Sequence, residues 1–165
     1  MKKIFFLLMM LMVTTISAQE QSESSIIAKV DSLQLELSNL KHEFNYYYCS
    51  SELKSLANEL NIKANNIHIQ AIEIKTNLYD SSYNDESYRM FKRNYNAYVN
   101  NFEQYKRLLA TSVKGVLITI EQSNFPDFRI KMLKSYFFTI ETNVEFVQSK
   151  LDYYKDLMEL YKSLE

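Results

Sequence analysis

The segment IKMLKSYFFTIETNVEFVQSKLDYYKDLMELY, residues 130–161, decides the fold. Apolar residues recur along it at alternating steps of three and four, which is the spacing of one face of an α-helix. This seam consists of Ile130, Leu133, Phe137, Ile140, Val144, Val147, Leu151, Tyr154, Met158 and Tyr161. A second apolar line runs beside the seam, through Met132, Phe146, Tyr153 and Leu160. Because the combined arc is wide, we expect this helix to contact two neighbouring helices.

The rest of the chain repeats the helical pattern. A similar seam rich in tyrosine and phenylalanine runs from Tyr88 to Ile120, and the whole chain holds one glycine and one proline. A β-rich domain of this size would need more of those turn-forming residues. We therefore predict an all-α fold, an antiparallel bundle of three long, coiled-coil-like helices at about residues 22–79, 85–122 and 127–164.

The first of these helices carries two seams. Ile26, Val30, Leu33, Leu37, Leu40, Phe44 and Tyr47 form one, and Leu53, Ala57, Leu60, Ala64, Ile67, Ala71, Ile74 and Leu78 form the other. Leu53 lies six positions after Tyr47, whereas the heptad repeat requires a step of seven. The helix is therefore either continuous but irregular, or kinked or broken near residues 46–51, which would give four helices. The alanines of the second seam favour close approach of an antiparallel neighbour.

The N-terminus has the pattern of a signal peptide. Lys2 and Lys3 precede an apolar run from Ile4 to Val13, and small residues follow as far as Ala18. We expect cleavage after Ala18, leaving a single helical-bundle domain at residues 19–165 in the periplasm or outside the cell. The single cysteine, Cys49, either is a free thiol near a core face or pairs between chains.

Composition and motifs exclude several functions. Without Lys2 and Lys3 the chain carries 17 basic and 20 acidic residues, so we expect no nucleic-acid binding. His42 and His68 stand apart from any metal-ligand spacing, and one glycine cannot form a phosphate-binding loop. We therefore expect no catalytic residues, no metal and no cofactor.

Two surfaces are candidates for binding. The first comprises Leu33, Leu40, Phe44, Tyr46, Tyr47 and Tyr48, because adjacent helical residues point 100° apart and three consecutive tyrosines cannot all face one partner. The second is a basic ribbon of Arg89, Arg93, Arg107 and Lys114, which would suit an anionic glycan, a lipid headgroup or an acidic protein. Both sets also fit ordinary roles, as core aromatics and as charges that complement the acidic first helix.

The leading functional hypothesis is an exported, non-catalytic protein with a structural, scaffolding or protein-interaction role. A protein partner or self-association is expected, because the first seam needs a facing helix. One alternative is a membrane-active or pore-forming protein, which is not favoured because the apolar segment from Leu108 to Ile120 is shorter than a bilayer span. A further alternative is a bundle that binds a small ligand between its helices.

Overall fold

The computed structural model describes the backbone of residues 2–79 and 83–165, and the side chains of residues 23–79 and 83–165. It contains three helices, α1 (Lys2–Tyr79), α2 (Asp85–Ser123) and α3 (Asp127–Lys162), and no strand within the described residues. The chain divides into two units, Met1–Phe44 and Asn45–Glu165. The predicted all-α fold is confirmed.

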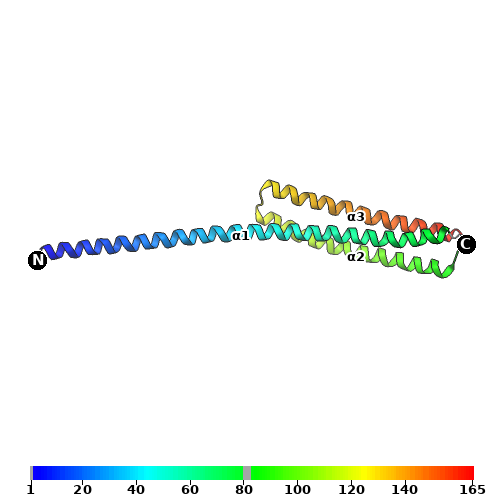
Figure 1. Cartoon of the computed structure of the whole chain (residues 1–165), viewed down its shortest axis with the longest axis horizontal. Coiled ribbons are helices and arrows are strands. Elements are labelled where there is room, and N and C mark those ends of the chain that lie inside the picture. The colour runs from blue at the N-terminus through cyan, green and yellow to red at the C-terminus, as the bar shows by residue number, and fades with distance from the viewer. Residues whose placement is uncertain (1, 80–82) are drawn as a thin grey trace. The chain divides into compact units, whose positions relative to one another are not determined.

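The second unit is an antiparallel three-helix bundle. Figure 1 shows the chain reversing direction between α1 and α2 and again between α2 and α3, so α2 runs antiparallel to both of its neighbours. Every second-seam residue of α1 from Leu53 to Ile74 is buried. From the other two helices, the buried apolar residues are Phe91, Phe102, Tyr105, Leu109, Val116, Leu133, Ile140, Val147, Leu151, Tyr154, Met158 and Tyr161. The heptad spacing therefore identified the core correctly.

The ends of α2 and α3 follow from local chemistry. The side-chain oxygen of Asn84 accepts hydrogen bonds from the backbone N–H groups of Glu86 and Ser87, at 2.9 and 3.1 Å, and so caps α2. Asn124 ends α2 in the left-handed conformation, with φ of 51°, which asparagine tolerates better than most residues. Pro126 then precedes the first turn of α3, where its missing N–H costs nothing.

Hydrogen bonds between helices fix how the bundle is aligned. The Tyr105 hydroxyl of α2 donates to the Leu56 carbonyl at 3.4 Å, and the Asn143 amide of α3 donates to the Ala57 carbonyl at 2.8 Å. One turn of α1 therefore receives a bond from each of the other two helices. The Tyr154 hydroxyl donates to the Phe91 carbonyl at 3.2 Å, which joins α3 to α2.

The structure decides between the two alternatives for residues 46–51. The continuous helix holds, because α1 is helical without a break from Lys2 to Tyr79. That segment contains no glycine or proline, and a six-residue step moves the buried face by about 100° around the helix without interrupting its hydrogen bonds. The expected contact of α3 with two helices is confirmed, since Asn143 bonds to α1 and Tyr154 bonds to α2. On its second apolar line, Met132, Phe146 and Leu160 are exposed.

The N-terminal part of α1 begins earlier than the expected residue 22, at Lys2. The signal peptide predicted at residues 1–18 lies where the structure describes no side chains. Among the helices as described, no stretch is both long enough and apolar enough to cross a bilayer.

Candidate interaction surface

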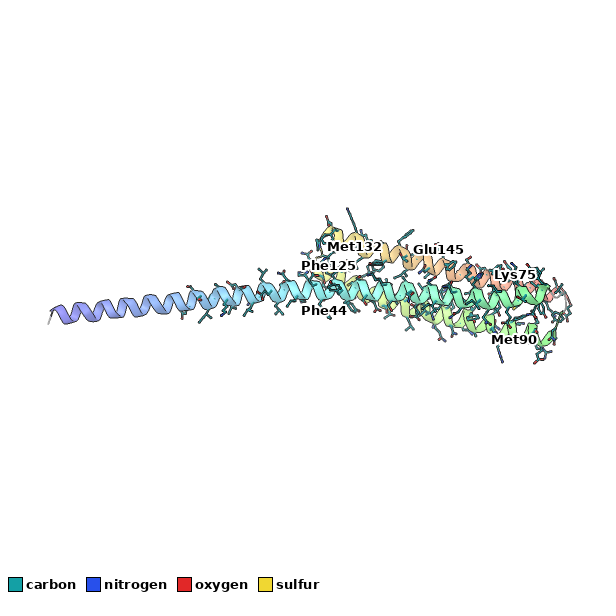
Figure 2. All side chains as sticks on the ribbon, viewed as in Figure 1. Phe44, Lys75, Met90, Phe125, Met132 and Glu145 are labelled. Atoms are coloured by element: carbon teal, nitrogen blue, oxygen red, sulfur yellow. The ribbon has the colours of Figure 1, made fainter. Side chains whose placement is uncertain are left out.

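Exposed apolar side chains form a row along the first unit. We call Ile26, Val30, Leu33, Leu37, Leu40 and Phe44 the N-terminal seam. All six side chains are exposed, with Leu33 at 59%, Leu40 at 66% and Phe44 at 71% of their full accessibility. Figure 2 shows side chains projecting from the ribbon along this part of α1. The heptad spacing places all six on one face of the helix, within an arc of about 80°.

The three consecutive tyrosines are divided between bundle and solvent, as their 100° spacing requires. The ring of Tyr46 meets Phe125 edge to face at 6.0 Å between centroids, and its hydroxyl donates to the Met132 sulfur at 3.4 Å. Figure 2 places Phe125 and Met132 together at the end of the bundle where α2 leads into α3. Tyr47 and Tyr48 are exposed, at 68% and 45%. Tyr46 therefore contributes to the packing of the bundle, and its two neighbours remain accessible.

The predicted basic ribbon consists of two separate pairs of charges. Arg89, Arg93, Arg107 and Lys114 are all exposed and lie on one face of α2. Arg89 forms an ion pair with Asp85, at 2.7 Å, within the same helix. Between Arg93 and Arg107, about 21 Å of this face has no positive charge, because the face there carries Asn96, Asn100 and Glu103. This arrangement forms no dense cationic patch.

Cys49 is buried in the bundle, and His68 is half-buried beside an aromatic ring. Cys49 is fully buried, and its sulfur lies 4.0 Å from the Val116 carbonyl oxygen. Burial raises the pKa of this thiol, which disfavours the reactive thiolate. The ring of His68 lies 6.1 Å from that of Tyr153, and the described residues provide no partner for its buried Nδ1 atom. Across the side chains that the structure describes, no three His, Cys, Asp or Glu residues come together as a metal site.

A groove between α2 and α3 was not predicted from the sequence. It has a volume of about 460 Å³ and is lined by Leu109, Val113, Phe137, Ile140 and Val144. Charged side chains also line it, among them Glu145, which Figure 2 labels midway along α3. Its apolar lining residues on α3, Phe137, Ile140 and Val144, belong to the heptad seam, so the sequence identified this face as apolar without showing the groove beside α2.

Comparisons with protein-family models, with characterised proteins and with solved structures find no match to this chain.

Proposed function

We propose that this protein is exported through its N-terminal signal and serves, without catalysis, as a structural or scaffolding protein that binds another polypeptide. The N-terminal seam is the binding face. The observation that carries this proposal is the exposure of six large apolar side chains at heptad spacing on one helix face. Export is supported by Lys2, Lys3 and the apolar run that follows them.

The size of the exposed face supports a binding role. Burying a large aliphatic side chain yields about 1.5–3 kcal/mol at about 25 cal/mol per Å², which corresponds to about 100 Å² for each side chain. The six members of the seam then present roughly 600 Å² of apolar surface. That area equals the largest apolar patch expected on a typical monomer, about 300–600 Å², and such patches mark interaction sites.

The spacing of the seam indicates what kind of surface would cover it. A stripe with alternating steps of three and four fits the side chains of a second helix, which insert between its own. A flat lipid surface would instead favour a broad apolar face with lysine or arginine opposite. The only basic residues from Glu23 to Phe44 are Lys29 and Lys41, and acidic residues outnumber them. A helical protein partner therefore fits better than a membrane.

Single glutamate substitutions test this proposal. Leu33→Glu and Leu40→Glu each place a charge in the seam, and Leu35→Glu is the matched control because Leu35 is 65% exposed and lies on the opposite face. We expect the seam variants to lose self-association or partner binding, measured as molar mass by light scattering after size exclusion. The control should retain it.

The melting temperature, followed by circular dichroism, separates binding from folding. Because the seam side chains are exposed and the bundle core is elsewhere, we expect all three variants to melt within a few degrees of wild type. If Leu33→Glu instead unfolds the entire chain, the seam belongs to the folding core and the proposed function is wrong.

A further inference from the structure

We infer that the partner of the N-terminal seam is a second copy of this chain, aligned parallel and in register to form a two-stranded coiled coil over residues 26–44. This inference rests on the proposed function and specifies its partner. In the lettering of a heptad, Val30, Leu37 and Phe44 occupy the a positions, and Ile26, Leu33 and Leu40 occupy the d positions.

Charge complementarity selects the parallel arrangement. In a parallel pair, a residue at a g position meets the e residue five positions further along the second helix. Glu36 is at g and Lys41 is at e, and both are exposed. An in-register parallel dimer therefore forms the Glu36–Lys41 pair twice, once on each side of the seam.

The other arrangements match the charges less well. In an antiparallel pair, g residues face g residues. The antiparallel alignment that uses the whole seam pairs Lys29 with Glu43 twice but places Glu36 opposite Glu36, so like charges meet at its centre. An antiparallel alignment shifted by one heptad either places Glu36 opposite Glu43 or leaves part of the seam unpaired. A parallel pair shifted by one heptad places Lys29 opposite Lys41, loses both Glu36–Lys41 pairs and forms a single Glu43–Lys41 pair. The in-register parallel pair buries all six apolar side chains and forms opposite-charge pairs without placing like charges opposite each other.

The area also suits a second copy. Two seams of roughly 600 Å² each would bury about 1,200 Å² of apolar surface, which reaches the range of about 1,200–2,000 Å² found in stable interfaces. Ile27, exposed at 61%, lies at an e position beside the seam and adds to this area. The parallel pair therefore requires no further surface from the rest of the chain.

Disulfide trapping tests the register directly. At a d position in a parallel, in-register dimer, equivalent residues face each other closely enough for a disulfide. Leu33→Cys in the purified protein should therefore form a covalent dimer under mild oxidation, while Leu35→Cys on the opposite face should not. Native Cys49 is buried and should not compete. Equal trapping of both variants, or no trapping of Leu33→Cys, would overturn the parallel register.

Charge reversal provides an independent test. Glu36→Lys places lysine opposite Lys41 and should raise the dimer dissociation constant about tenfold, and the double variant E36K/K41E should return it to within about twofold of wild type. Sedimentation equilibrium measures these constants. A Glu36→Lys variant that dimerises as tightly as wild type, or more tightly, would indicate antiparallel pairing and overturn the inference.

The outcomes separate this inference from the proposed function. The wild-type protein could stay monomeric at about 100 μM and yet bind a different polypeptide, with binding lost in Leu33→Glu and kept in Leu35→Glu. That result would overturn the inference that the partner is a second copy, and it would support the N-terminal seam as a binding face. A monomer that binds no polypeptide through this face overturns both.

Discussion

Raising the pH above 10 should destabilise the bundle through two buried tyrosines. Tyr154 is fully buried and Tyr105 is 6% exposed. Burial raises the pKa of both phenols well above the ordinary value of 10, and the negative charge of Glu59 raises that of Tyr105 further. Since the folded pKa is the higher one, the unfolded chain releases these protons first. Stability is therefore intact below pH 10 and is lost as the pH rises beyond it.

The expected loss can be estimated for pH 11. This pH is about one unit above the pKa of a phenol in the unfolded chain. Ionisation of each phenol there stabilises the unfolded state by about 1.4 kcal/mol. Two phenols that stay protonated in the folded bundle together cost about 2.8 kcal/mol. That is a large part of a typical free energy of unfolding, about 5–15 kcal/mol.

The double variant Tyr105→Phe/Tyr154→Phe isolates this effect. At pH 8 it should be less stable than wild type by about 1–2 kcal/mol, because each hydroxyl donates a hydrogen bond to a backbone carbonyl. From pH 8 to pH 11 it should lose about 2.8 kcal/mol less than wild type. The two stability curves should therefore cross between about pH 10 and about pH 10.7, and at pH 11 the double variant should be the more stable protein. Urea denaturation followed by circular dichroism measures both curves.

Tyr79→Phe is the control, since Tyr79 is 76% exposed, and it should follow the wild-type curve. Equal losses between pH 8 and 11 for wild type and the double variant would refute the reasoning. They would mean that these phenols ionise as readily in the bundle as in the unfolded chain.

Three further predictions concern the bundle. Asn84→Ala should lower the free energy of unfolding by about 1 kcal/mol in urea titrations, because it removes the cap of α2, and an unchanged value would contradict that role. Ala64→Leu should cost about 1–3 kcal/mol because Ala64 is fully buried, whereas Ala97→Leu on the exposed face of α2 should change stability by less than about 0.5 kcal/mol. Cys49 should resist a thiol reagent in the native protein and react once urea unfolds it, so rapid native labelling would show that the thiol is accessible.

Periodicity predicted the bundle because burial in it follows helix spacing closely. The ten-residue seam that begins at Ile130 contributes seven buried residues, including Tyr154 and Tyr161, and the rest of it is half-buried. The same spacing identified the row from Ile26 to Phe44 as a seam. It could not show that these side chains are exposed, because a heptad pattern states that a face is apolar without stating what covers it.

The sequence did not show which individual side chains contact each other between the helices. Nothing in the composition distinguishes Asn143, which donates to a carbonyl of α1, from the exposed Asn96 and Asn100. Likewise, the three consecutive tyrosines indicated that their roles must differ, but only the positions of Phe125 and Met132 show that Tyr46 is the packed one. Of the two alternatives for the change of register near Cys49, the continuous helix holds, because a helix can change its buried face without losing a backbone hydrogen bond.

The paired bonds on one turn of α1 have a consequence for alignment along the helix axis. Apolar seams with a seven-residue repeat can slide past each other by one heptad, about 10 Å, and still interlock. Such a slide in α2 or α3 would carry Tyr105 or Asn143 away from the carbonyls of Leu56 and Ala57. A buried donor left without an acceptor costs about 1–3 kcal/mol. These two side chains therefore select one axial register of the three helices from several registers that would bury their apolar seams almost equally well.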